Sequence, residues 1–261
     1  MMNSSTSKTN SKASNLKLVK NILQFVIPLI FWIGVWQIAA VIVDHKFLLP
    51  DVTETMRALF DLASDATFYK AIIYSAIRVL FGLMLGILAG IALAVLSNRF
   101  WIADVIITPI ITVIKSTPVA SFIVVLWVML SGDALAVFVG FLMVMPIIWQ
   151  NTRDGFSAID PMLSEVADIF EFSYQKRFKL LIFPTLKQYL IPGIVTASGL
   201  AWKAEIAAEI IAYTKKSIGQ GINDAKYEMD TPTVFAWTII IIALSIVLEK
   251  TTKYLLRRSK I

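Results

Sequence analysis

The sequence contains no cysteine and a single histidine, His45. Disulfides, thiolate catalysis and cysteine-based metal sites are therefore excluded, and histidine-based metal or acid–base chemistry is disfavoured. His45 directly follows a hydrophobic run, so we expect it at the membrane surface. There is also no G-x-x-x-x-G-K-[ST] phosphate loop and no clustered acidic metal motif. These absences argue against an enzyme and predict no catalytic residue and no metal or other cofactor bound by this chain.

Charge is also scarce. Only 16% of the 261 residues are charged, whereas 57% are hydrophobic, and the mean hydropathy is +0.75. A soluble domain usually has about 25% charged residues, so this composition indicates an integral membrane protein. The net charge of +6 is spread over the ends of hydrophobic runs. That distribution fits orientation in a lipid bilayer better than binding to nucleic acid.

The long hydrophobic runs predict an all-α, polytopic membrane protein with about six transmembrane helices. Residues 1–21 are rich in Ser, Asn and Lys and are predicted to form a disordered tail, followed by a single transmembrane domain over residues 22–261. The first apolar run is too long for a cleaved signal peptide, so we expect it to be retained. The expected spans are 23–43, 72–96, 103–130, 134–151, 188–213 and 233–254.

Two of these spans carry internal signals. Gly82, Gly86 and Gly90 lie four residues apart, and we expect this face to pack closely on another helix. The third run contains Pro109 and the sequence KSTP at residues 115–118. Proline removes a backbone donor and disfavours helix at the preceding residue, so a bend or an interrupted helix is expected. Such a break is tolerated at membrane depth only against protein or a watery cavity.

An even number of spans places both termini on the same side of the membrane. The tails and the connections on that side hold fifteen Lys and Arg residues, and the opposite side holds six. The positive-inside rule then predicts that both termini and the connection between the fourth and fifth spans lie in the cytoplasm.

A few charged residues fall inside the spans, where charges usually face the bundle interior. Arg78 could anchor the chain by snorkelling or line a pathway. Lys115, beside the break at Pro118, could attract an anionic solute or pair with a carboxylate. Glu205 and Glu209 are one turn apart on one helix face, and internal ion pairing or an outer-end gate is favoured over direct substrate contact. These four charged residues, together with Pro118, are the pathway or gate candidates.

A charged, amphipathic segment in the middle of the chain is SEVADIFEFSYQKRFKLLIFPTL, residues 164–186. Asp160 and Pro161 are a good helix start, and apolar and acidic residues then alternate with helical spacing. Ser173 is predicted to cap a second short helix with a basic polar side, and Pro184 to stop it. The first helix has no basic residue, which favours a protein partner over lipid contact.

The spacing in this segment resembles the EAA signature of ABC-importer permease subunits: E-A-A, three residues, G, nine residues, I, one residue, L-P. Glu165, Ala167 and Pro184 occupy family positions, Leu181 stands for the isoleucine and Phe183 for the leucine. The resemblance implies a pair of short coupling helices over about 160–184 that contact an ATPase. The residues assigned to this coupling are Glu165, Val166, Ala167, Glu171, Leu181 and Pro184.

One position departs from the signature. Glu171 replaces the glycine that normally marks the turn between the two short helices. We therefore expect the turn to fall nearer Ser173, or the first helix to be longer.

Three further stretches resemble the nitrate, sulfonate, taurine and bicarbonate branch of these permeases. They are YSAIRVLFGLMLGILAGIALAVLSNR, KSTPVASFIVVLWVMLSGDA and AEIIAYTKKSIGQGINDAKYEMDTPTVFAW, similar to the second span, the proline-containing third segment and the connection between the last two spans. In the last of them Glu209, Gly219, Gly221, Ile222 and Ala225 match. The resemblance covers most of residues 45–250 in the family's order.

The resemblance implies a type I importer in the bacterial inner membrane, in which two permease copies, identical or different, form the pathway for a small anionic or zwitterionic solute. A separate ABC ATPase would use ATP and Mg, and an extracytoplasmic solute-binding protein would deliver the solute. The alternative is an ion-gradient-driven secondary transporter that uses Glu205 and Glu209.

Overall fold

The computed structural model describes residues 24, 26–45 and 47–258, so the predicted disordered tail, residues 1–21, lies outside the described residues. In the described part the regular secondary structure is entirely helical, which confirms the predicted fold class. The helices are Val26–Val43, α2 Val52–Ala63, α3 Ala66–Arg99, α4 Trp101–Ser116, α5 Val119–Trp127, α6 Asp133–Ser157, α7 Pro161–Ile169, α8 Tyr174–Arg177, the π-helical turn η1 Phe178–Ile182, α9 Phe183–Ile211, α10 Ile218–Tyr227 and α11 Thr231–Arg258.

Among the described residues, five helices are long and apolar enough to cross a membrane, and the bent pair α4 and α5 makes a sixth candidate. Several helices extend beyond the expected spans. α3 has 34 residues, which at 1.5 Å per residue corresponds to about 50 Å, against a hydrocarbon thickness of about 30 Å. α3 is therefore longer than the apolar layer is thick.

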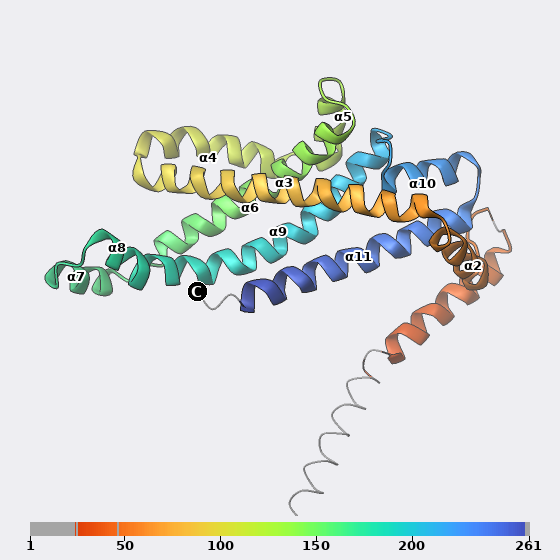
Figure 1. Ribbon diagram of the computed structural model, residues 1–261, viewed down its shortest axis with the longest axis horizontal. Helices are drawn as coiled ribbons and strands as arrows, with labels where there is room; N and C mark the ends of the chain where they lie inside the picture. The colour runs from red at the N-terminus through yellow and green to blue at the C-terminus, as the bar shows by residue number, and fades with distance from the viewer. Residues whose placement is uncertain (1–23, 25, 46, 259–261) are drawn as a thin grey trace, which may run out of the picture.

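The centre of the bundle is built from α3, α6 and α9, and α11 packs along α9 (Figure 1). The glycine face of α3 lies against α6, which confirms the expected close packing. A Cβ atom at Gly86 would lie 2.5 Å from Cβ of Val144, and one at Gly90 would lie 2.8 Å from Cβ of Ile148. Side chains larger than hydrogen at these positions would force the two helices apart.

The expected break in the third span occurs at the KSTP sequence. α4 ends at Ser116, α5 begins at Val119, and the two helix axes are bent by 100°. Thr117, which precedes Pro118, has an extended backbone, the conformation that a following proline favours. Pro109 lies inside α4 without ending it.

Two helices that the hydrophobic pattern did not indicate, α2 and α10, lie at one end of the bundle, far from α7 and α8 (Figure 1). The side chains of Asp51 and Ser217 cap their N-termini. α10 packs on α9 and α11, and Gly221 approaches Trp237 so closely that a Cβ atom there would lie 2.6 Å from the indole. We call this end, with α2 and α10, the α10 end.

Candidate functional site

Near the α10 end, Arg78 of α3 connects four parts of the chain. Its Nη1 atom donates to Oε1 of Glu209 at 2.8 Å, its Nε atom donates to Oδ1 of Asp133 at 2.8 Å, and its Nη2 atom donates to the carbonyl oxygen of Lys215 at 3.2 Å. Arg78 is only 6% exposed. The residue therefore does not snorkel toward a surface but holds α3, the start of α6, the end of α9 and the following loop together.

Glu209 is fully paired inside this cluster. Besides Arg78, it accepts a hydrogen bond from the Ser75 hydroxyl at 2.7 Å and one from the Gly219 N–H at 3.3 Å. Ser75 in turn accepts the Ile218 N–H at 3.1 Å, so the first turn of α10 is held by the same network. We call Arg78, Glu209, Ser75 and Asp133 the ionic cluster.

Sequence reasoning missed two members of the ionic cluster. Ser75 lies three residues before Arg78, a spacing that places both on one face of α3. Asp133 begins α6 directly after Gly132, whose φ of +57° turns the chain sharply. The charge in the short SGD connection was the available signal for Asp133.

Glu205 lies one turn before Glu209 but has a different environment. Its side chain is 0% exposed, and neither carboxyl oxygen has a hydrogen-bond partner among the described residues. A Cβ atom at Gly82 would lie 2.3 Å from Oε1 of Glu205, and one at Gly140 would lie 1.7 Å from it. The carboxyl group thus fills a space that two glycines leave open. The anticipated ion pairing is found at Glu209 and not at Glu205.

Lys115 and Pro118 do not join the ionic cluster. Both are exposed at the bend between α4 and α5, and within the described ranges no carboxylate lies within ion-pair distance of Lys115. The five pathway candidates therefore separate into a buried group of three and an exposed pair.

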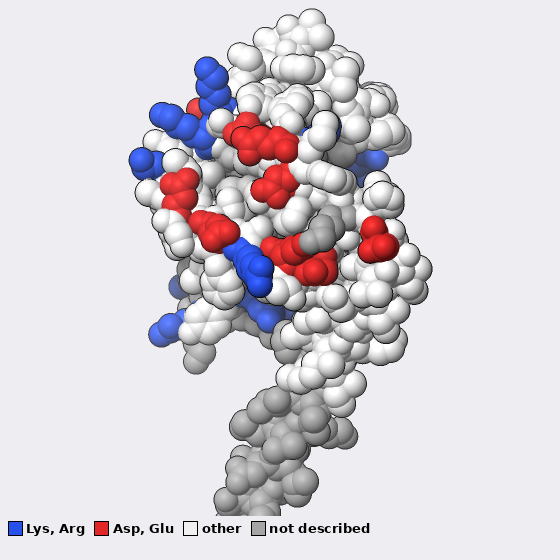
Figure 2. Space-filling model, turned by 90° about the vertical axis from the view of Figure 1, so that its right-hand side faces the viewer, with Lys and Arg blue, Asp and Glu red and all other residues white. Residues whose placement is uncertain are grey.

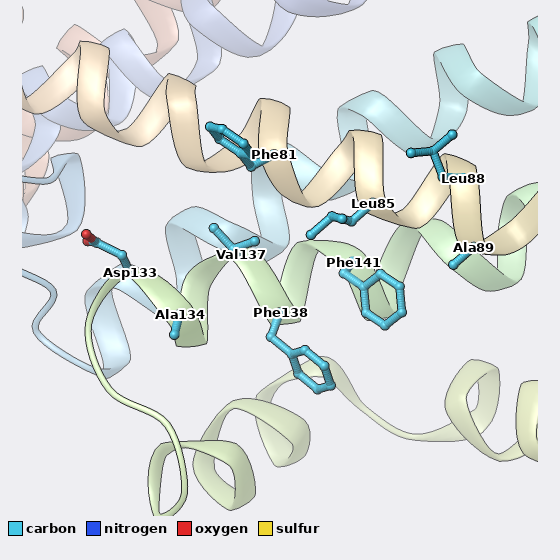
Figure 3. Close-up of a pocket in the computed structure, with 9 residues that line it drawn as sticks. All are labelled: Phe81, Leu85, Leu88, Ala89, Asp133, Ala134, Val137, Phe138 and Phe141. Carbon is cyan, nitrogen blue, oxygen red and sulfur yellow. The ribbon is translucent and has the colours of Figure 1, made fainter.

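Beside the ionic cluster, an apolar groove of about 760 Å³ runs between α3 and α6 (Figure 3). Phe81 and Leu85 line it from α3, Phe138 and Phe141 line it from α6, and Asp133 lies at one end. Because its lining is apolar apart from Asp133, the groove is suited to hydrocarbon or another apolar surface and not to a charged solute.

At the α10 end, acidic side chains gather on the surface (Figure 2). One hollow there is lined by Glu54, Asp61, Asp65 and Asp230 together with Arg57. The two ends of the bundle therefore differ in charge, since the opposite end carries the basic residues of α8 and its neighbours.

At the opposite end of the bundle, α7 and α8 form a short helical hairpin, residues 160–182 (Figure 1). The turn lies at Glu171, whose φ is +48°. The Phe172 N–H donates to the carbonyl oxygen of Ala167 at 2.9 Å, and the Glu171 N–H donates to that of Asp168 at 3.0 Å. This is the bonding pattern of a helix end closed by a left-handed residue, a position that glycine usually occupies. The turn is therefore at Glu171, not nearer Ser173, and α7 is not lengthened.

Ser173 caps α8 as predicted, accepting a hydrogen bond from the Lys176 N–H at 3.4 Å. Pro184, however, does not stop the second helix. α8, η1 and α9 follow without interruption from Tyr174 to Ile211, and Pro184 lies in the first turn of α9. The π-helical turn before it accommodates the proline, because i→i+5 bonding relieves the crowding and the missing donor that proline brings to a regular α-helix.

The two faces of the hairpin differ. Ala167 is 3% exposed and Leu181 is also buried, so these signature positions face the protein. Glu165 is exposed, and Ile169 is 77% exposed. The other large apolar side chains on the outward face are Met162, Leu163, Val166 and Phe170.

An ion pair that the sequence did not indicate holds the hairpin closed. Nη1 of Arg177 on α8 lies 2.6 Å from Oδ1 of Asp168 on α7, and Arg177 also donates to the Ser164 hydroxyl. The hairpin is thus a small closed unit with a row of exposed apolar groups, placed at the head of the continuous helix that leads to Glu209.

The fold is that of an ABC-transporter membrane subunit. A crystal structure of an amino acid ABC transporter matches with a TM-score of 0.59 at 17% identity, covering 73% of this chain and 91% of that one. The methionine ABC transporter MetNI in inward-facing conformations matches with a TM-score of 0.56 at 12% identity, covering 72% of this chain and 92% of that one.

Residues 82–261 match the family of binding-protein-dependent transport system inner membrane components, and the chain belongs to this family. It is therefore a multi-pass permease subunit of an ABC importer. Among similar proteins, the putative aliphatic sulfonates permease SsuC of Bacillus subtilis is 23% identical over 80% of this chain and 76% of its own. The bicarbonate permease CmpB of a Synechocystis species is 28% identical over 68% of this chain and 64% of its own. The taurine permease TauC of Escherichia coli is 21% identical over 85% of this chain and 83% of its own.

Proposed function

We propose that this chain forms the translocation pathway for a small anionic or zwitterionic solute and that its α7–α8 hairpin docks on a separate ABC ATPase. The observation that carries the docking proposal is the outward face of the hairpin. It presents a row of large apolar side chains at the end of the bundle, while Ala167 and Leu181 fasten the other face to the protein. Exposed apolar patches of this kind mark sites of protein contact.

The continuous helix from Tyr174 to Ile211 supports a mechanism of coupling. Because Pro184 does not break it, a displacement of the hairpin is carried along α9 to Glu209, and through Arg78 to α3 and the start of α6. ATP binding and hydrolysis in the partner would then shift the balance between outward-open and inward-open arrangements. In this mechanism the chain itself performs no catalysis and binds no cofactor, and ATP and Mg belong to the partner.

The remaining partners follow from the family. A second permease copy, identical or related, would complete the pathway, and a solute-binding protein would meet the α10 end from outside. The Lys and Arg distribution supports placing the hairpin and both termini in the cytoplasm. The relatives named for sulfonates, taurine and bicarbonate support a solute of similar size and charge.

The docking surface is tested by Glu165→Lys. Glu165 lies exposed on α7, so charge reversal should leave insertion and folding unchanged but weaken ATPase binding or uncouple ATP hydrolysis from uptake. The matched control is Glu228→Lys, the same change at an exposed residue beyond α10, which should retain ATPase binding. Co-purification in mild detergent and uptake into vesicles measure both. Normal assembly and uptake in the Glu165 variant would remove this residue from the docking surface.

The use of ATP is tested separately. Uptake is measured in vesicles with the ion gradients held constant and ATP either present or absent. We expect uptake to stop without ATP. Uptake that continues on the ion gradient alone, together with no ATPase in the purified complex, would instead favour a secondary transporter.

A further inference from the structure

Glu205 is a buried carboxyl group that the proposed coupling mechanism does not use. It is 0% exposed, and neither of its oxygens has a hydrogen-bond partner in the described part of the chain. An ionised carboxylate in such a position costs several kcal/mol, by an order-of-magnitude estimate, whereas the neutral acid costs far less. The site therefore suits a carboxyl group that holds a proton.

The charged groups around Glu205 do not offer a counter-ion. The charge of Arg78 on α3 acts on Glu205, but that guanidinium already binds Glu209 and Asp133. Glu209, one turn along α9, is negative in its pairing with Arg78 and so disfavours a second negative charge nearby. Asp133, at the start of α6, is paired with the same guanidinium, and its side chain is largely exposed. Lys203 lies on the exposed side of α9.

The other helices that pack against α9 also offer no counter-ion to Glu205 among the described residues. α5 has no ionisable side chain. On α10, Asp224 accepts a hydrogen bond from Tyr213. On α11, Glu249 lies beside Gly199, more than a turn from Glu205 along α9.

Besides lacking a free counter-ion within the described ranges, Glu205 is tightly packed. Gly82 of α3 and Gly140 of α6 approach the carboxyl group so closely that a Cβ atom at either would overlap Oε1. An ionised carboxylate needs water or donors within hydrogen-bond distance. Water can reach this carboxyl group only if α3 or α6 moves away from α9.

We propose that Glu205 is a proton-binding site that controls the junction of α3, α6 and α9. In the closed junction the carboxyl group holds its proton. When the junction opens, the O–H bond breaks, the proton passes to water, and the hydrated carboxylate then favours the open arrangement. Higher pH should therefore favour opening. The proposal concerns the chain by itself and does not rest on the identity of the ATPase or the solute.

The protonation state is tested by infrared spectroscopy on the full chain in a lipid bilayer. At neutral pH we expect a C=O stretching band of a protonated carboxylic acid that is lost in Glu205→Gln. The control Glu249→Gln, at an exposed glutamate, should keep that band. If wild type and Glu205→Gln show the same protonated-acid signal, the Glu205 carboxyl group is ionised and the proposal is wrong.

The opening of the junction is tested by spin-label distances, for which the natural absence of cysteine gives a clean background. Labels are placed at Met84→Cys on α3 and Phe138→Cys on α6, both exposed positions. The titration runs from about pH 6 to about pH 10, a range that includes the ionisation of buried carboxyl groups. We expect the distance to lengthen with pH in the otherwise wild-type chain and to stay constant when Glu205→Gln is added.

Two results of the distance measurement would overturn the proposal: a distance that does not change with pH, or an equal change with and without Glu205→Gln. Glu205→Met, also neutral and of similar size, replaces the Gln variant if that variant is not recovered. Failure of both neutral variants to fold also contradicts the proposal, because the closed junction should accept a neutral side chain.

Discussion

The two ends of the helix that runs from Tyr174 to Ile211 differ in where their charged residues lie: buried at one end and at the surface at the other. At the α10 end, Glu209 is buried and every contact of the ionic cluster is made within the bundle. At the hairpin end, Arg177 and Asp168 pair at the surface, beside apolar side chains that face outward. One end holds the bundle together, and the other is available to a partner.

The difference predicts how global stability and local order are divided along one helix. Loss of a partner inside a buried ionic cluster leaves an uncompensated charge, whereas loss of a surface ion pair costs little. Variants at the ionic cluster should therefore change the free energy of unfolding. Variants in the hairpin should change local order and partner binding while the bundle remains folded.

The largest effect is expected for Arg78→Ala. The change leaves Glu209 buried without its cation, so the free energy of unfolding should fall by about 3–5 kcal/mol. Thermal and denaturant unfolding of the detergent-solubilised chain measure it. Arg99→Ala is the matched control, because Arg99 ends the same helix at an exposed position. Equal stability of the two variants would contradict the role of the ionic cluster.

A smaller loss is expected for Gly140→Ala, because the new Cβ atom would overlap the Glu205 carboxyl group. Overpacking of this kind costs about 1–3 kcal/mol. Gly34→Ala is the control, since nothing lies within 4 Å of a Cβ atom there.

A double-mutant cycle with Glu205→Ala identifies the clashing group in the Gly140 variant. If the loss comes from the carboxyl group, the two changes should be clearly non-additive and the double variant should recover part of the stability. Additive losses would place the clash elsewhere.

In the hairpin, Glu171→Gly should increase the local stability of the turn between α7 and α8. Glu171 adopts a left-handed backbone, and glycine removes a penalty of about 1 kcal/mol there. Hydrogen exchange of the α7–α8 amides should slow, with little change in global unfolding. Glu165→Gly is the control: the same change at a helical position of the same hairpin should speed the exchange. Faster exchange in both variants would show that Glu171 is not strained.

The smallest effect concerns Asp65, which caps α3 at an exposed position of the α10 end. Hydrogen bonds from the hydroxyl and N–H groups of Thr67 lower the pKa of Asp65 below its ordinary value of 3.8. Because the pKa is lower in the folded chain, the cap contributes stability above the ordinary pKa and loses it as pH falls through the folded value. Amide exchange at the start of α3 should therefore increase below about pH 4, and Asp65→Asn should lack this acid dependence.

The sequence predicted the elements whose signals are local. Long apolar runs indicated about six spans, and proline after Thr117 indicated the break that separates α4 from α5. The helix start at Asp160 and the cap at Ser173 follow from side chains that bond to the neighbouring backbone. The family itself was also recognisable, because residues 164–186 keep most of the spacing of the EAA signature and three further stretches follow in the family's order.

Other features depended on contacts that residue types do not reveal. Pro184 indicated a helix end by local rules, but a π-helical turn before it allows the helix to continue. Because Glu171 replaces a glycine, the turn was expected nearer Ser173. The hydrogen bonds of the helix end instead hold Glu171 in the left-handed conformation that glycine would take.

The clearest division is between Glu205 and Glu209. The sequence determined that two carboxyl groups lie one turn apart on the same helix face, because helical periodicity is local. Only the tertiary structure decided that Arg78, Ser75 and the start of α10 meet Glu209, while Gly82 and Gly140 enclose Glu205. The physical reason is that desolvation and pairing depend on which helices pack together, and that packing brings together residues more than a hundred positions apart.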